Sequence, residues 1–471
     1  MKRITVECLR KFTYISGKDL QLPLAEMCFS RSFIGDRRGD PYPLLSSSAE
    51  PGETVEGGVW RVCGSAERLL GSFFPYASYE LKAIRPFSQV GFVFRIGNET
   101  LSLTRSESEL FFSFAGEREI REIPDGGADS LIVSCRPGFF DVFFRYERDL
   151  QYFTTFDVPG LSGVASEAIF SRATVSTLVE SGCVERVRAY LDSGIGIADV
   201  RPIRYENGEV MVEGGKVYLT VSIRLVAGKY QGVLAWVPGT SDLSLVGAIF
   251  YDAGDGVWSA DVAASILYHR EKRLWYLWAC SFSHGHVLCH ASFEGDVRFG
   301  VNVVDVRTMP LADENDDRRA FLGFAGDEDP DFFYDAERGI WTMAICRLDG
   351  QSRTYRYRFF ESESPFDGYR YIGEGESGAE TGGSFVRLRD ERVFICGNDF
   401  HARSDYRIYD KDGMYHPTFN YPDGGFRGWG TLIPIKLGTR TRYFWLTFDR
   451  RLGSDYNWSY GNLYCFEAYL D

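Results

Sequence analysis

The chain has 471 residues, of which 44% are hydrophobic and 25% charged, and this composition excludes wholesale disorder. A formal charge of −14 and the lack of a basic tract argue against a dedicated nucleic-acid binder or a protein of anionic membranes. Aromatic residues make up 15% of the chain and glycines number 50, which indicates many short strands joined by tight turns.

The first 45 residues begin with Met1, Lys2 and Arg3, but no apolar run follows them. We therefore expect no signal peptide in the chain as written. The expected location is cytoplasmic, or periplasmic or secreted if a signal peptide has been removed. No stretch of about 18 apolar residues occurs, so no membrane span is predicted. We expect residues 1–45 to supply an outer strand that closes the C-terminal domain.

Residues 46–185 contain evenly spaced short runs of alternating or continuous apolar residues, among them ASYELKAI, GFVFRIG and FFDVFFRY. Gly, Asp, Asn and Glu turns separate these runs, a pattern typical of a β-sandwich. Residues 79–94 are similar to a concanavalin- or laminin-G-type jelly roll. A short helix is expected over about 164–180.

From about residue 190 to 471 the sequence repeats in five units, each with a short strand, a turn and an aromatic-rich strand. Four units open with an acid, namely Asp199, Asp261, Asp329 and Glu380, spaced 62, 68 and 51 residues apart. The fifth opens with Gly428 and has no acid. Units of this length hold four strands each, so we predict an all-β chain with a five-bladed propeller at 190–471.

The four acids are expected at the mouth of the propeller, because the first strand of each blade lines the axis. Carboxylates packed this closely repel one another, and burial raises the pKa of at least one. Two carboxyl groups with separated pKa values are what glycosidic cleavage needs. The alternative is that each acid only caps a turn at the start of its strand.

Three short segments resemble motifs of glycoside hydrolase families 32 and 43. Residues 328–335 (EDPDFFYD) are similar to the Arg-Asp-Pro segment of family 32. Residues 379–383 (AETGG) resemble its Glu-Cys-Pro segment or the Glu-Gly-Pro of family 43, and residues 198–202 (ADVRP) resemble the opening Asp-Pro segment of both. The resemblance implies a five-bladed propeller that cleaves furanosides and related glycosides such as fructosides, arabinosides and xylosides.

The same resemblance implies roles for three acids. Asp199 would be the nucleophile or base, Asp329 would stabilise the transition state or tune a pKa, and Glu380 would be the general acid. Polar side chains of the loops at the mouth suit recognition of hydroxyl groups, and Trp258 or Trp429 is expected to stack on a sugar face. The expected substrate-binding residues are Asp261, Trp258, His284, Asn398, His401, Trp429 and Arg427.

Two rival functions remain open at this stage. One is a glycoside phosphorylase, which would need a basic cluster beside Glu380. The other is a non-catalytic carbohydrate-binding propeller. The expected partner is an oligosaccharide or glycoside, with no nucleic acid, no membrane and no cofactor. His284, His286 and His290 do not have zinc spacing, so no metal site is predicted. The sequence does not specify the sugar, the stereochemical outcome or the oligomeric state.

Overall fold

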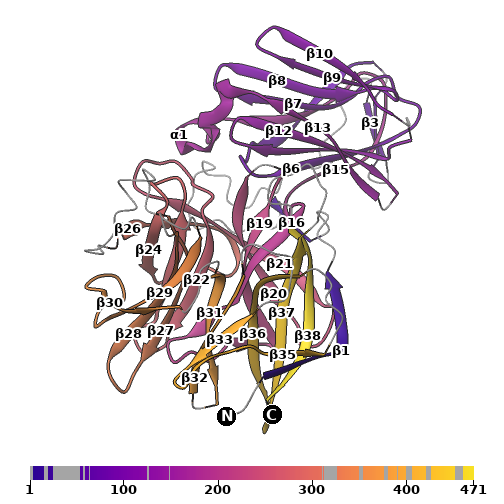
Figure 1. Cartoon of the computed structure of the whole chain (residues 1–471). Coiled ribbons are helices and arrows are strands. Elements are labelled where there is room, and N and C mark those ends of the chain that lie inside the picture. Colours follow the sequence, from indigo (N-terminus) through magenta and orange to yellow (C-terminus); the bar gives the residue numbers. More distant parts are fainter. Residues whose placement is uncertain are drawn as a thin grey trace. The chain divides into compact units, whose positions relative to one another are not determined.

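The computed structural model divides the chain into two compact units (Figure 1). One unit comprises Met1–Leu20, Ser193–Gly254 and Ser259–Asp471, and the other Gln21–Asp192 with Asp255–Trp258. No helix of the described residues is long and apolar enough to cross a membrane. The structure describes residues 4–14, 20–24, 53–56, 59–62, 64–124, 127–147, 149–226, 228–309, 311, 326–348, 354–375, 380–389, 391–398, 406–420, 426–450 and 460–470.

The unit built around Gln21–Asp192 is a sandwich of two antiparallel sheets, drawn mainly as purple strands in Figure 1. The first sheet has the order β10 (Glu117–Glu122), β9 (Glu109–Phe114), β8 (Glu99–Arg105), β7 (Val90–Ile96), β14 (Thr174–Val179) and β5 (Ala66–Ser72). The second has the order β13 (Asp149–Asp157), β12 (Phe139–Tyr146), β11 (Ser130–Arg136), β6 (Ser78–Ile84), β15 (Gly182–Asp192), β4 (Val59–Val62) and β3 (Glu53–Glu56), with β2 (Gln21–Pro23) beside β15.

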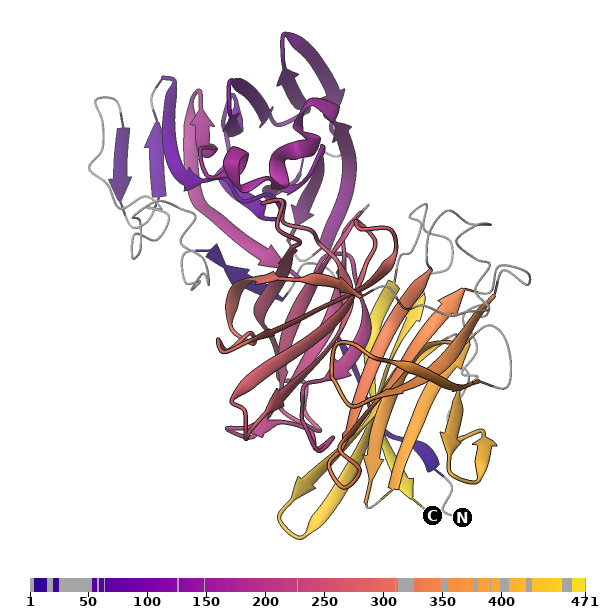
Figure 2. The ribbon, with the colours of Figure 1, turned by 90° about the vertical axis from the view of Figure 1, so that its left-hand side faces the viewer.

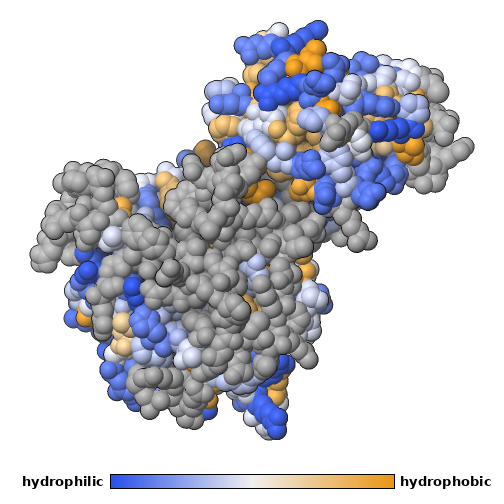
Figure 3. All heavy atoms as spheres, turned by 45° about the vertical axis from the view of Figure 1, so that its right-hand side comes forward, coloured by the Kyte–Doolittle hydropathy of each residue, from blue (hydrophilic) through white to orange (hydrophobic). Residues whose placement is uncertain are grey.

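Aromatic side chains from the two sheets fill the space between them. The rings of Phe112 and Phe156 stack with centroids 4.2 Å apart, and Phe94 packs on Phe140 at 5.2 Å. Such rings bury large apolar areas, and the inward alternation along each strand provides them. On the face in Figure 3, hydrophilic and apolar residues are interspersed over the described surface.

The helix expected over 164–180 is largely absent. A 3₁₀ turn at Pro159–Ala165 and the single helical turn α1 (Glu167–Phe170) precede the strand β14. The β14 sequence, TVSTLV, is rich in β-branched residues, which favour strands. Its edges pair with both β5 and β7, so tertiary pairing determines the outcome.

In its described part, the larger unit contains five sheets of four to six strands, which we call blades 1 to 5. Blade 1 holds β16 (Gly196–Pro202), β18 (Val212–Glu213), β19 (Lys216–Arg224), β20 (Lys229–Trp236), β21 (Leu243–Asp252) and β25 (Gly300–Asp305), and blade 2 holds β17 (Arg204–Tyr205), β22 (Val262–His269), β23 (Leu274–Ser281), β24 (Val287–Phe293) and β26 (Arg307–Met309). Blade 3 holds β27 (Asp327–Asp335), β28 (Ile340–Leu348), β29 (Tyr355–Ser362) and β30 (Arg370–Glu374), and blade 4 holds β31 (Glu380–Leu388), β32 (Glu391–Asn398), β33 (Arg407–Asp410) and β34 (Gly413–Tyr415). Blade 5 holds β36 (Phe426–Leu437), β37 (Arg440–Arg450), β38 (Tyr460–Leu470), β1 (Ile4–Tyr14) and β35 (Thr418–Asn420).

The five blades form a closed ring. The inner strand of each blade contacts the inner strand of the next, in the order β16, β22, β27, β31 and β36, and β36 contacts β16 again. This arrangement is a five-bladed propeller. All five inner strands begin at the same end of the ring, which we call the mouth.

The ends of the chain meet in blade 5. The strand β1 pairs antiparallel with β38, from Ile4 opposite Leu470 to Tyr14 opposite Leu463. Figure 2 shows the indigo β1 among the yellow C-terminal strands. An outer strand was expected from residues 1–45, and residues 4–14 form this one; residues 25–45 lie outside the described part of the chain.

Candidate active site

Four of the inner strands share a β-bulge near the mouth, which adds one residue to the inner strand relative to its partner. The first residue of each bulge has a positive φ, between 48° and 60°. This backbone conformation is unfavourable for most side chains, so a non-glycine residue there indicates a constraint. The four residues at these bulge positions are Asp199, Ala263, Asp329 and Gly382.

The bulges show that the four predicted acids do not occupy one register. Asp199 and Asp329 occupy bulge positions. Asp261 and Glu380 lie two residues before theirs, at what we call capping positions, where blade 3 carries Asp327. The four acids were expected at equivalent positions, but they occupy two levels of the inner strands: the bulge positions and the capping positions. The sequence repeat does not distinguish the two levels, because residues of both lie near the start of a strand.

The acids at the bulge positions interact with each other. Asp329 is 6% exposed and Asp199 is 7% exposed. Burial, and then the negative charge of Asp199, raise the pKa of Asp329 to about 6. The Oδ2 atom of Asp329 accepts hydrogen bonds from Thr381 Oγ1 at 3.0 Å and from the Gly382 N–H at 3.1 Å. Blade 4 thus holds the Asp329 carboxyl group in place.

A buried arginine moderates this repulsion. Arg201 lies two residues after Asp199 in β16 and is 4% exposed. Its Nη1 atom donates to the carbonyl oxygens of Ala263 and Pro330, at 3.0 and 2.8 Å, and so joins blades 1, 2 and 3. Its charge lowers the pKa of Asp329, which burial and Asp199 nevertheless keep above the ordinary value.

A second basic group flanks Asp199 at the mouth. Arg224, at the end of β19, places Nη2 3.4 Å from Asp199 Oδ2. The adjacent strand starts with Lys229, whose Nζ atom lies 3.0 Å from the centre of the Phe282 ring. Burial, and then the nearby Arg224, lower the pKa of Lys229 to about 8. Among the described residues, Asp199 is therefore the member of the acid pair that forms an ion pair with an arginine side chain.

Three residues that the sequence analysis did not assign to the site lie next to Asp329. Glu328 Oε1 accepts a hydrogen bond from the Tyr355 hydroxyl at 2.6 Å and lies 2.7 Å from His286 Nε2. Burial alone would raise the pKa of Glu328, but these two partners outweigh it and the pKa lies below its ordinary value. The acid-rich run 327–331 was the available signal for this cluster.

Asp261 and His284, both expected to bind substrate, form hydrogen bonds within the turn after β23, and their substrate-binding role stays a prediction. The Asp261 carboxylate accepts hydrogen bonds from the hydroxyls of Ser259, Ser281 and Ser283 at 2.8–3.1 Å and from the Phe282 N–H at 3.0 Å. His284 Nδ1 lies 2.8 Å from Ser281 Oγ. These bonds fix the turn between β23 and β24, so at this position the turn-capping alternative describes the acid.

Asp327 has the same kind of structural role in blade 3. Arg347 donates to both of its carboxylate oxygens, at 2.7 and 3.1 Å, and the two side chains are at most 1% exposed. A buried, two-point pair of this kind fixes β27 against β28. The Arg347 side chain is buried in this ion pair and does not face the solvent at the mouth.

Glu380 is fully buried, and its side chain reaches between blades 3 and 4. Oε2 accepts the Tyr357 N–H at 3.1 Å, and Oε1 accepts the Tyr409 hydroxyl and lies 3.4 Å from Arg407 Nη1. Burial raises the pKa of Glu380, although these three partners oppose the rise. A raised pKa was expected, but the cause is burial in the space between blades.

Of the other five residues expected to bind sugar, the structure describes the side chain of one, Trp258. Trp258 is fully buried in the sandwich unit, where its ring packs on Phe74 and Phe170 with centroids 6.0 and 4.7 Å apart. It therefore has no free face for a sugar. The side chains of Asn398, His401, Trp429 and Arg427 lie outside the described residues.

The described residues contain no group of three or more His, Cys, Asp or Glu side chains that could hold a metal ion. In the described part of the chain, one cation, Arg407, lies beside the Glu380 carboxylate, and this is fewer than the basic cluster expected for a phosphorylase. The chemistry that the described mouth offers is acid–base chemistry by carboxyl groups, with arginine and lysine beside them.

No protein-family model matches the sequence, and no curated protein matches it. Solved structures do. One is a thermostable family-43 glycoside hydrolase, at 12% identity over 59% of this chain and 90% of that chain, with a TM-score of 0.42. Another is the catalytic domain of a GH62 alpha-L-arabinofuranosidase from Coprinopsis cinerea, at 12% identity over 58% and 90%, with a TM-score of 0.39.

A third is the alpha-L-arabinofuranosidase of Podospora anserina in complex with cellotriose, at 11% identity over 58% of this chain and 91% of that chain, with a TM-score of 0.38. The chain is thus similar to propeller glycoside hydrolases. Likeness at this level supplies no argument about substrate or catalytic residues, which depend on the geometry of the mouth.

Proposed function

We propose that this chain is a glycoside hydrolase whose reaction is carried by Asp199 and Asp329 at the mouth of the propeller. The observation that supports it is the pair of bulge positions, where two acids from different blades share a buried environment and one has a pKa of about 6. Two acids with different protonation states are the requirement for cleaving a glycosidic bond.

In this proposal Asp199 acts as nucleophile or base. Arg224 beside it stabilises the negative charge. Asp329 carries the proton, because burial and the Asp199 charge hold its pKa near 6, which suits proton donation close to neutral pH. Thr381 and Gly382 orient its Oδ2 atom. The substrate class we propose is a furanoside or a related glycoside.

The surroundings of Glu380 give it a supporting role in this proposal. A general acid must reach the leaving oxygen, and the Glu380 carboxylate is buried and bonded to Tyr357, Tyr409 and Arg407. We therefore assign Glu380 to supporting blades 3 and 4 and assign proton donation to Asp329. If Glu380 is the acid, it must be uncovered when substrate binds.

The test is a hydrolysis screen on aryl furanosides and aryl pyranosides, followed by variants on any substrate found. Asp199→Asn and Asp329→Asn should each lower turnover by about 10²–10⁴-fold. Glu380→Gln should then change turnover far less than Asp329→Asn does. A different result would assign the general acid to Glu380. In that case Asp329→Asn and Glu380→Gln would lose equal turnover on glycosides with poor leaving groups, and only Glu380→Gln would regain turnover on activated aryl glycosides.

The rival of another class is a non-catalytic carbohydrate-binding propeller. It predicts that wild-type protein binds glycans but hydrolyses no glycoside in the screen. Binding that survives Asp199→Asn and Asp329→Asn, with no turnover by the wild type, would replace the hydrolase proposal with this one.

A further inference from the structure

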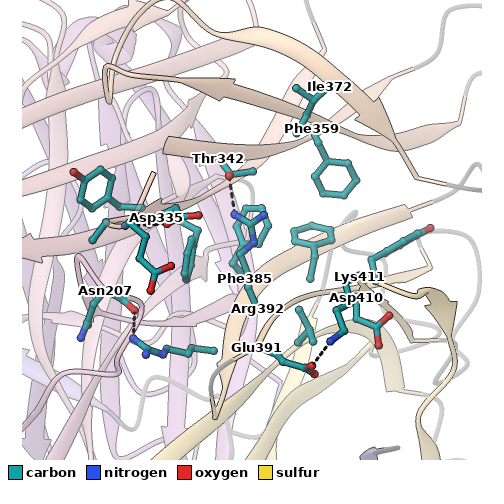
Figure 4. Close-up of a pocket in the computed structure, with 18 residues that line it drawn as sticks. Asn207, Asp335, Thr342, Phe359, Ile372, Phe385, Glu391, Arg392, Asp410 and Lys411 are labelled. Carbon is teal, nitrogen blue, oxygen red and sulfur yellow. Dashed lines mark hydrogen bonds and ion pairs between the residues drawn. The ribbon is translucent and has the colours of Figure 1, made fainter. Parts of the chain in front are cut away.

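The propeller has a pocket between blades 3 and 4, away from its mouth. Its volume is about 760 Å³. The lining comes from the far end of β27, the far end of β31 and the start of β32, with contributions from β29, β30 and β33 (Figure 4). Six residues of strand separate Asp329 from Asp335 on the rim, a span of roughly 20 Å along β27. The pocket is therefore a separate site from the acid pair.

Aromatic rings form its walls. Phe333, Phe359, Phe385 and Phe394 come from four different strands, and Phe394 packs edge-on against both Phe359 and Phe385 with centroids 5.2 and 5.0 Å apart. Ile372, 51% exposed, stands above Phe359 at the opening (Figure 4). Ring faces of this kind pack against the apolar faces of flat or ring-shaped ligands.

One cation lies among these rings, and the carboxylates of Asp335 and Glu361 are close enough to favour its charged form. The Arg392 guanidinium is centred 5.0 Å from the Phe333 ring and 5.6 Å from the Phe385 ring. Its Nη1 atom donates to Thr342 Oγ1 at 2.7 Å (Figure 4). Among the described residues it forms no ion pair with a carboxylate, and burial lowers its pKa. A guanidinium has five N–H donors, so this one retains donors for a ligand anion.

Several other charged groups of the rim have partners within the chain, and Asp335, another lining carboxylate, accepts the Glu337 N–H at 3.1 Å. Glu391 pairs with Lys411 at 2.9 Å, and Arg387 donates to the Asn207 carbonyl oxygen at 3.1 Å. Asp410 accepts the Asp412 N–H at 2.8 Å. These carboxylate and amide groups still have lone pairs and donors suited to hydroxyl groups. The pocket therefore combines ring faces, hydroxyl-binding groups and one arginine with free donors.

We propose that this pocket binds a uronic-acid-type sugar unit, with its ring on the phenylalanine faces and its carboxylate on Arg392. A planar guanidinium binds a carboxylate at two points, which fixes the orientation of the ring. A neutral sugar leaves the free donors of Arg392 unused, and a purely aromatic acid leaves the hydroxyl-binding rim unused. The proposal is independent of hydrolysis, because it concerns a different site and equilibrium binding.

The test is calorimetric or ligand-observed NMR titration of the full chain with glucuronic acid, using glucose and benzoate as comparison ligands. Glucuronic acid should bind at least about tenfold more tightly than glucose, because glucose has no carboxylate for Arg392. It should also bind more tightly than benzoate, because benzoate has no hydroxyl groups for the rim. Arg392→Met keeps the apolar stem over the rings and should weaken glucuronic acid binding by about tenfold. The matched control is Arg95→Met, which removes an exposed arginine of the sandwich unit that pairs with Glu67.

A second variant keeps the test decisive if Arg392→Met does not fold. Ile372→Asp places a negative charge at the exposed opening and should repel the uronate, whereas Ile120→Asp, at a 61% exposed site of β10, should not. Equal binding of glucose or benzoate, no detectable binding of glucuronic acid, or binding unchanged by the Arg392 and Ile372 variants would overturn the proposal. Turnover is not measured here, so failure of the hydrolase proposal leaves this result intact.

Discussion

The bulge positions and the capping positions of the propeller differ in what surrounds their acids, although two residues separate them. Asp199 and Asp329, at bulge positions, face another carboxyl group, and the pKa of Asp329 is raised. At the capping positions Asp261 is surrounded by hydroxyl and N–H donors and Asp327 by an arginine. An acid whose charge is balanced by hydrogen-bond donors or an arginine stabilises the fold. An acid that faces another carboxyl group lowers the stability of the fold, so its presence points to a function.

The largest expected effect is on turnover, and it separates the two levels. On a glycoside that the wild type hydrolyses, Asp329→Asn should lower kcat by about 10²–10⁴-fold, because an amide cannot supply the proton. Asp261→Asn, the control from the capping level, should leave kcat within about threefold. Steady-state kinetics on one substrate measure both. Equal losses for the two variants would remove the distinction between levels.

The next largest effect is on folding. Asp327→Asn should lower the free energy of unfolding by about 3–5 kcal/mol, because it leaves the buried Arg347 without its counter-charge. Glu361→Gln is the control: it breaks the exposed ion pair with Arg338, which is worth at most about 1 kcal/mol. Urea unfolding of both variants gives the comparison. An Asp327 variant as stable as the Glu361 variant would contradict the structural role of the capping level.

Asp329→Asn should have the opposite effect on stability. The pKa of Asp329 is about 6 in the folded protein against an ordinary value of 3.8. Between these two pH values Asp329 is protonated in the folded chain but ionised in the unfolded chain. The contribution of Asp329 to the free energy of unfolding is therefore lost as the pH rises from about 4 to 6. The wild type should lose up to about 3 kcal/mol over this range. The variant should lack that slope and melt at a higher temperature at pH 7.

The smallest predicted effect concerns Asp261. Replacement by asparagine keeps one acceptor oxygen and removes the other, so some hydroxyl and N–H donors of the turn after β23 lose their partner. We expect a loss of about 1–2 kcal/mol in the free energy of unfolding. Chemical denaturation measures it, and Ser106→Ala, at an exposed turn in the sandwich unit, serves as a comparison.

The sequence was sufficient for the strands and the five units, because alternating apolar residues and regular spacing survive any change in the surrounding loops. It was not sufficient for the register of the acids. The runs beginning at Asp199 and Asp261 look alike, and only pairing with the neighbouring strand shows that a bulge shifts one against the other. The sequence therefore identified Asp199 and Asp329 as candidate site residues, but it could not show that Asp261 occupies a different position relative to the bulge.

The direction in which a side chain points was the other feature that the sequence could not predict. Glu380 starts its strand as predicted, yet its carboxylate reaches Tyr357 and Tyr409 in the outer strands of two blades. Trp258 belongs to a four-residue segment that packs in the sandwich unit, although the residues on either side of it belong to the propeller. Neither outcome follows from local pattern, because both depend on contacts between distant parts of the chain.

The pairing of β1 with β38 affects how this protein can be made. The strand β1 precedes blades 1 to 4 in the chain and its neighbour β38 follows them, with residues Gln21–Asp192 of the sandwich unit between β1 and blade 1. During synthesis the strands of this segment can pair soon after they emerge, whereas blade 5 stays incomplete until β38 has emerged. Contacts between residues so far apart in the chain form slowly. Closure of the ring therefore waits for β38, and loss of β38 would leave β1 only its short parallel pairing with β35.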